Sequence, residues 1–185
     1  MFVALITISL IVDKTGIAVI ALLACLIHEL GHIIMFCVVG YKPISLSFEL
    51  TGICLTKPTS QLSYPKEVMV QLAGSAMNFI MFALLCKSMT EISFTSIFAT
   101  THLVVGIFNL LPLKNFDGGK LLEITLLRFM SIKTTDFICT FIDLTCIFLL
   151  LIASVYSFFV EERSLTLIVI TIYLMVTALI KLNQD

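Results

Sequence analysis

The feature that most constrains this chain is a series of long apolar runs bounded by charged residues, glycine or proline. A transmembrane helix needs about 20 apolar residues. Four runs reach or approach that length: Gly16 to Val39, Val68 to Cys86, Ile92 to Leu111 and Ile138 to Val160. Three others are shorter or marginal: Leu165 to Ile180, Leu121 to Ile132 and Met1 to Val12. The sequence therefore predicts an all-α polytopic membrane protein with about five to seven transmembrane or half-membrane helices.

Composition supports lipid as the main solvent of the chain. Of its 185 residues 59% are hydrophobic and 12% are charged, whereas soluble domains have about 25% charged residues. The net charge of -1 provides no polybasic surface, so we expect no nucleic-acid partner. The expected partners are the lipid bilayer and other membrane proteins.

A segment of different character separates the first two long runs. Gly40 to Lys66 contains three prolines, and Ile44 to Leu50 alternates apolar and polar residues before Gly52. Period-two alternation followed by glycine predicts a small β-hairpin, which we place at the membrane surface.

The first long run contains an unusual group of polar residues. Apart from cysteines, its ionisable residues are His28, Glu29 and His32, and a charged side chain at the bilayer centre costs about 2.5–3.5 kcal/mol unless it is compensated. A separation of four residues turns the two histidines only about 40° apart on a helix, so both can bind one metal ion. Glu29 lies about 100° further round, where its carboxylate can accept a proton from water activated by the metal.

Two histidines leave a catalytic zinc site one protein ligand short. The acidic candidates for the third ligand are Asp117, Glu123, Asp143 and Glu49. Asp117 is favoured because Pro112 should end the preceding helix and Gly118-Gly119 should free the backbone beside the acid. Irregular backbone at membrane depth is tolerated where it is buried or lines a water-filled cavity.

These segments together resemble the site-2 protease family of intramembrane metalloproteases. The resemblance rests on three motifs: His28-Glu29-Leu30-Gly31-His32, Asn109-x-x-Pro112-x4-Asp117-Gly118-Gly119, and more weakly Ala73-Gly74-Ser75-Ala76-Met77-Asn78. Ser75 stands where the family usually has proline. The layout looks like the compact bacterial branch that processes sporulation or stress transcription-factor precursors.

The resemblance implies a site and a function. It implies that His28, His32 and Asp117 bind one Zn2+ per chain, that Glu29 is the general acid and base, and that Asn78 and Asn109 lie near the substrate or the oxyanion. One membrane-embedded domain would span residues 1–185, with a catalytic core at about 15–125 and accessory helices at 135–182. The expected substrate is a membrane-tethered regulatory protein cleaved in or near its transmembrane segment, in the bacterial cell membrane, and a membrane partner could restrain the enzyme.

Other functions are compatible with the same residues. A metal transporter could use the His, Glu and Asp cluster as a transit site, although it gives no reason for glutamate in the HExxH order. A catalytically silent scaffold, or a membrane-bound protease acting on soluble peptides, are further alternatives. His102 shares a helix face with Asn109 and either lines the cavity or serves as a hydrogen-bonded packing residue.

Overall fold

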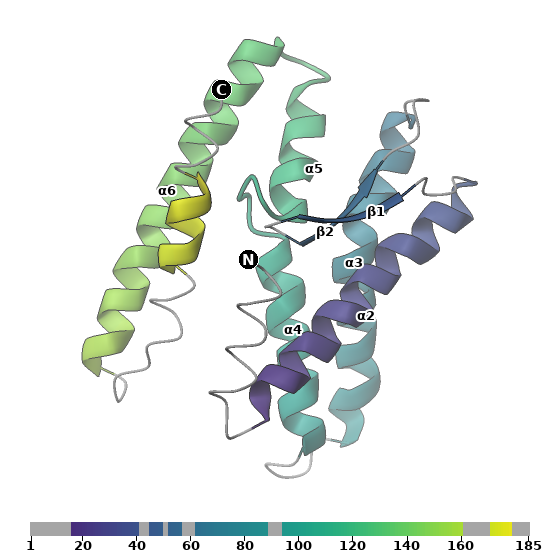
Figure 1. Cartoon of the computed structure of the whole chain (residues 1–185), viewed down its shortest axis with the longest axis vertical. Coiled ribbons are helices and arrows are strands. Elements are labelled where there is room, and N and C mark those ends of the chain that lie inside the picture. Colours follow the sequence, from purple (N-terminus) through teal and green to yellow (C-terminus); the bar gives the residue numbers. More distant parts are fainter. Residues whose placement is uncertain are drawn as a thin grey trace. The chain divides into compact units, whose positions relative to one another are not determined.

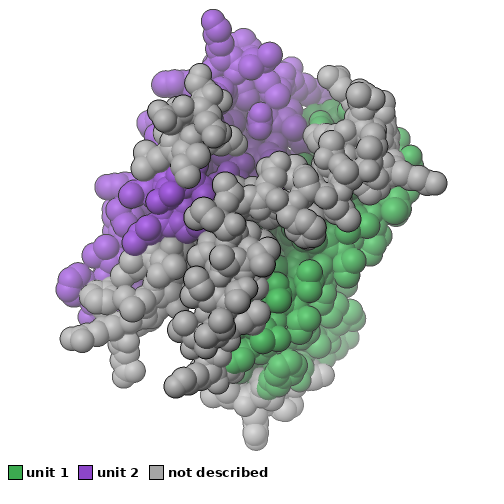
Figure 2. Space-filling model, in the orientation of Figure 1, with its two compact units in different colours: residues 1–111 green, residues 112–185 purple. Residues whose placement is uncertain are grey.

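The computed structural model describes residues 16–40, 45–49, 52–56, 62–88, 94–160 and 171–178. The chain divides into two compact units, residues 1–111 and 112–185 (Figure 2). The boundary falls at Pro112, a residue type that cannot continue a helix without losing a backbone hydrogen bond. The expected catalytic core therefore draws on both units, and the single-domain organisation of residues 1–185 stays a prediction.

The described part of unit 1 contains three α-helices. They are α2 (Ile17–Val38), α3 (Tyr64–Leu85) and α4 (Phe94–Asn109), with the short 3-10 helix η1 (Cys86–Ser88) after α3. α3 packs against both α2 and α4, and α2 also contacts α4 (Figure 1). Each helix thus has one face toward the other two.

The two faces of α2 show how the sequence sets this packing. Every fourth residue along one face is buried: Ile20, Ala24, His28, His32 and Phe36. Large apolar side chains are exposed on the other face: Val19, Leu23, Leu26, Leu30 and Ile34. An exposed apolar stripe is what a lipid-facing helix surface requires, so the two histidines belong to the face that points into the protein.

Two strands lie between α2 and α3. β1 (Ser45–Glu49) and β2 (Gly52–Thr56) pair antiparallel, with Leu46 opposite Leu55 and Glu49 opposite Gly52. β1 falls within the alternating stretch from which a hairpin was predicted. Its placement at a membrane surface stays a prediction.

Unit 2 contains α5 (Asp117–Leu126), α6 (Ile132–Val160) and a helical stretch at residues 171–178. α5 and α6 contact each other. The marginal segment predicted at Leu121 to Ile132 is not one element, because the chain leaves α5 after Leu126 and turns before α6 begins. Arg128 and Ser131 lie in this turn.

Among the described residues, three helices are long and apolar enough to span a membrane. These spans are Ala18–Val38, Tyr64–Leu85 and Ile132–Ser157, and the shorter apolar helix Phe94–Asn109 accompanies them. The prediction of an integral membrane protein is confirmed at this level. The count of five to seven segments stays a prediction, since Met1 to Val12 and parts of Leu165 to Ile180 lie outside the described residues.

Candidate metal centre

The two histidines of α2 face each other on the buried side of the helix. His28 Nε2 and His32 Nε2 are 3.1 Å apart, and both side chains are almost fully buried. Two nitrogens that each lie about 2.0–2.1 Å from a tetrahedral zinc ion are roughly 3.3 Å from one another. The spacing of the nitrogens therefore fits a shared metal ion, as the HExxH spacing predicted.

Gly74 of α3 leaves room beside this nitrogen pair. A Cβ atom built on Gly74 would lie 2.6 Å from His28 Nε2 and would also collide with His32 Nε2. Any larger residue would occupy the space in front of the two nitrogens. The weak Ala73-Gly74-Ser75 resemblance thus has a physical counterpart in unit 1.

A second close approach holds α2 against α3. A Cβ atom on Gly31 would lie 2.6 Å from the carbonyl oxygen of Ala73. The absence of a side chain at Gly31 therefore permits α3 to come this close to α2. Glu29 is half-buried on the same helix, directly after His28.

Hydrogen bonds fix both imidazole rings from behind. His32 Nδ1 donates to the backbone carbonyl of Val70 at 2.8 Å, which leaves the lone pair of His32 on Nε2. Asn78 Nδ2 donates to His28 Nδ1 at 3.2 Å, and His102 Nδ1 donates to Asn78 Oδ1 at 2.8 Å. His102 is thus a buried, hydrogen-bonded residue of the helix group, and sequence periodicity could not identify its partner.

Asp117 is the first residue of α5 in unit 2 and is 6% exposed. The partial positive charge of a helix N-terminus stabilises a carboxylate there, and Lys120 Nζ lies 3.6 Å from Asp117 Oδ1. The expectation of free backbone at Gly118-Gly119 is wrong, because both glycines lie inside the first turn of α5. Glycine is required at position 119 for a different reason, because a Cβ atom there would collide with the Leu113 carbonyl.

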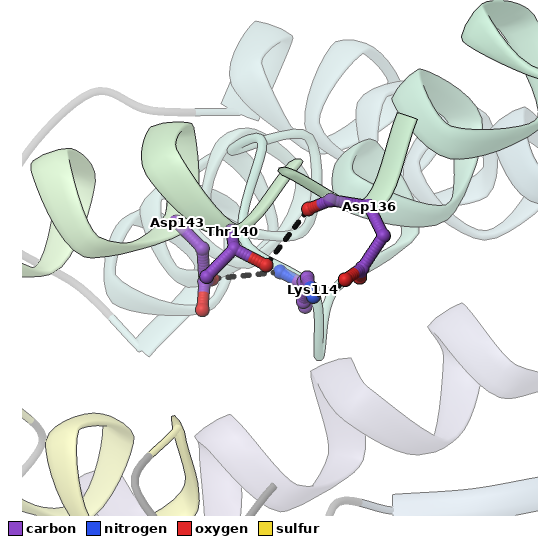
Figure 3. Close-up of polar contacts among 4 residues, drawn as sticks. All are labelled: Lys114, Asp136, Thr140 and Asp143. Carbon is purple, nitrogen blue, oxygen red and sulfur yellow. Dashed lines mark hydrogen bonds and ion pairs between the residues drawn. The ribbon is translucent and has the colours of Figure 1, made fainter. Parts of the chain in front are cut away.

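The loop before Asp117 is hydrogen-bonded to α6 (Figure 3). The backbone N–H of Lys114 donates to Asp143 Oδ1 at 2.8 Å, and Lys114 Nζ donates to Asp136 Oδ1 at 2.7 Å. Thr140 Oγ1 in turn donates to the backbone carbonyl of Asp136. Asp143, one of the candidate ligands from sequence, accepts a hydrogen bond from this loop.

The remaining candidates occupy other settings. Asn109 Nδ2 donates to the carbonyl of Val105, one turn earlier in α4, at 2.9 Å. Glu123 is exposed on α5. The side chain of Glu49 lies outside the described residues.

The fold has a solved counterpart. The structure is similar to that of the Site-2 Protease from Methanocaldococcus jannaschii, with a TM-score of 0.70 and 19% sequence identity over 96% of this chain and 84% of that chain. No protein-family model and no curated protein sequence matched. The resemblance stated from the motifs is confirmed at the level of the fold.

Proposed function

We propose that this chain is a zinc-dependent intramembrane endopeptidase, which hydrolyses a peptide bond in or near the transmembrane segment of another protein. One observation carries the proposal: two buried imidazole nitrogens face each other across 3.1 Å, with Gly74 leaving space in front of them. The spacing of these nitrogens fits two ligands of one tetrahedral zinc ion. The shared fold with a site-2 protease supports the same function.

His28, His32 and Asp117 would hold the metal ion. Together they offer two imidazoles and one carboxylate, a donor set that catalytic zinc uses while keeping its fourth position open. The hydrogen bond from His32 Nδ1 to Val70 orients that ring in the manner expected of a zinc-bound histidine. The assignment of Asp117, the first residue of α5, as the third ligand is part of this proposal.

The chemistry assigns a proton-transfer role to Glu29. Zinc, when bound, supplies a Lewis acid that polarises the scissile carbonyl and makes water a stronger acid. The Glu29 carboxylate accepts a proton from the attacking water as oxygen bonds to the carbonyl carbon. The carbon–nitrogen bond then breaks, and Glu29 returns the proton to the leaving amine. Asn109 would contact the substrate or the oxyanion, following the motif resemblance.

We propose that the substrate is a membrane-tethered regulatory protein, which cleavage releases from the membrane. The enzyme itself would be a multi-pass protein of the bacterial cell membrane. Its helix must open locally, because the carbonyls of an intact helix are already hydrogen-bonded. A membrane partner that restrains the enzyme is part of the same proposal.

Glu29→Gln tests the proposal. The variant should retain stoichiometric zinc, measured by elemental analysis of the purified protein, and should lose at least about 100-fold in cleavage of co-expressed membrane-tethered transcription-factor precursors. Glu123→Gln makes the same chemical change at an exposed position of α5 and should cleave like the wild type.

Two results would contradict this function. If the purified wild-type protein contained no zinc, the proposed zinc-dependent function would be wrong. Zinc flux across vesicles that persists in Glu29→Gln, without cleavage by the wild type, would instead identify a metal transporter.

A further inference from the structure

Three buried side chains from three different helices form a hydrogen-bonded row behind the metal centre. His28 is on α2, Asn78 on α3 and His102 on α4, and Asn78 and His102 have no exposed surface. Asn78 contacts His28 Nδ1 through its amide nitrogen and His102 Nδ1 through its amide oxygen. Both ends of the Asn78 amide are thus occupied by histidines.

The two facing histidines differ in what controls their tautomers. His32 Nδ1 contacts a backbone carbonyl, which can only accept, so the proton of His32 stays on Nδ1. His28 Nδ1 contacts a side-chain amide, which can present either a donor or an acceptor. The tautomer of His28 therefore depends on the orientation of Asn78.

The orientation of Asn78 decides whether His28 can bind metal. When Asn78 Nδ2 donates to His28 Nδ1, the proton of neutral His28 lies on Nε2 and points at His32 Nε2. A metal ion on His28 Nε2 requires the proton on Nδ1 instead. A half-turn of the Asn78 amide supplies the acceptor, because its oxygen and nitrogen have nearly the same shape.

We propose that Asn78 and His102 are positioning residues that switch His28 between these two tautomers. In the metal-binding arrangement Asn78 Oδ1 accepts from His28 Nδ1, and Asn78 Nδ2 donates to His102 Nδ1. His102 then carries its proton on Nε2 rather than Nδ1. All three side chains stay neutral in both arrangements, so no net proton is gained or lost. This inference rests on the proposed function, and it gives Asn78 a role behind the metal rather than at the substrate.

The residue type at position 102 fits this role. A neutral imidazole can serve at Nδ1 as donor or as acceptor, so it follows the half-turn of Asn78 without losing the hydrogen bond. A lysine could only donate, and an aliphatic residue could do neither. Among the described residues, His102 Nε2 has no hydrogen-bond partner. This nitrogen is bare in the first arrangement and carries the proton in the metal-binding one.

Nitrogen NMR of the intact protein tests the switch directly. The chain has three histidines, so a sample labelled with 15N-histidine in detergent micelles gives few signals. Protonated and bare ring nitrogens resonate far apart, and His102 is assigned by comparison with His102→Gln. Zinc should move the His102 proton from Nδ1 to Nε2, while chelation should move it back.

Asn78→Asp separates this switch from a merely structural role. Its carboxylate accepts from both histidines, so His28 is held in the metal-binding tautomer and His102 keeps its proton on Nδ1. Zinc affinity should stay within about 3-fold of the wild type or increase, and the His102 signals should no longer respond to zinc. Asn78→Leu should weaken zinc binding by about 10–100-fold in a chelator competition assay.

Substitutions at His102 complete the set. His102→Leu leaves one end of the Asn78 amide without a partner and should weaken zinc binding by about 10-fold. His102→Gln, whose own amide can turn over, should restore most of the affinity. Ser75→Ala is the matched control, because Ser75 is equally buried on α3 and its hydroxyl has no partner among the described residues. Its zinc affinity should be that of the wild type.

The outcomes distinguish the inference from the function on which it rests. Stoichiometric zinc in the wild type with His102 still protonated on Nδ1 would overturn the switch and leave the protease intact. Unchanged zinc affinity in Asn78→Leu would do the same. A wild type that binds no zinc would overturn both.

Discussion

At the scale of single residues, the space beside His28 and His32 exists because residue 74 is a glycine. Gly74 has no side chain, and any Cβ atom at that position would collide with the facing nitrogens. The sequence indicated Gly74 only as part of a weak motif. Its role follows from the approach of α3 to α2, which sequence spacing does not reveal.

Gly74→Ala should therefore weaken metal binding while the helices still form. Alanine favours the helix by about 1 kcal/mol relative to glycine, so a loss of zinc would come from the blocked space rather than from helix propensity. We expect at least about a 10-fold loss of zinc affinity and a similar loss of cleavage, measured on protein purified in detergent. Ala76→Val, which adds volume on the exposed face of the same helix, should bind zinc normally. Equal zinc affinity in Gly74→Ala would show that the metal lies elsewhere.

At the scale of elements, α6 anchors the loop that precedes Asp117. It holds the loop before Asp117 through two acids that bind the same residue, Lys114. Asp143 is 7% exposed and accepts from a backbone N–H, whereas the side chain of Asp136 is 61% exposed and forms an ion pair. The sequence placed both acids in an accessory region, since the partner of an acid in a helix is set by tertiary packing.

Asp143→Ala and Asp136→Ala should differ clearly. Loss of Asp143 leaves the part-buried Lys114 N–H without its acceptor, which costs about 1 kcal/mol or more, whereas an exposed ion pair contributes about 0–1 kcal/mol. Hydrogen exchange at residues 113–116 should accelerate in Asp143→Ala and stay near wild type in Asp136→Ala. Asp143→Asn, which keeps an acceptor oxygen, should resemble the wild type. Equal exchange in the two alanine variants would contradict this anchoring role.

At the scale of the whole molecule, the proposed zinc ligands come from both compact units. His28 and His32 belong to residues 1–111 and Asp117 to residues 112–185. A ligand that binds only the folded state stabilises it by about 2.7 kcal/mol at a concentration 100 times its dissociation constant. Zinc bound by all three residues should therefore stabilise the folded chain measurably.

Thermal unfolding in detergent tests the contribution of unit 2 to this site. Chelation should lower the unfolding temperature of the wild type, and Asp117→Ala should reduce that decrease because its zinc affinity is lower. Glu123→Ala removes an exposed acid of the same helix and should respond to chelation like the wild type. If Asp117→Ala bound zinc as tightly as the wild type, the third ligand would have to be sought among Glu123, Asp143 and Glu49.

The sequence by itself determined that this is a helical membrane protein and which polar residues of α2 are candidates for the metal site. Apolar runs can be read without a structure because a bilayer accepts few polar residues, so His28, Glu29 and His32 stand out from their surroundings. The four-residue spacing also fixed the common face of the two histidines, because helix periodicity is local.

Only the tertiary structure decided what surrounds those residues. The approach of Gly74, the row from His28 through Asn78 to His102, and the attachment of Lys114 to α6 all join segments that are distant in sequence. Such contacts arise from packing, and no local pattern of residues specifies them. Gly118-Gly119 was misread for a local reason: both glycines belong to the first turn of α5, and the Leu113 carbonyl, brought close by the turn before this helix, requires a small residue at position 119.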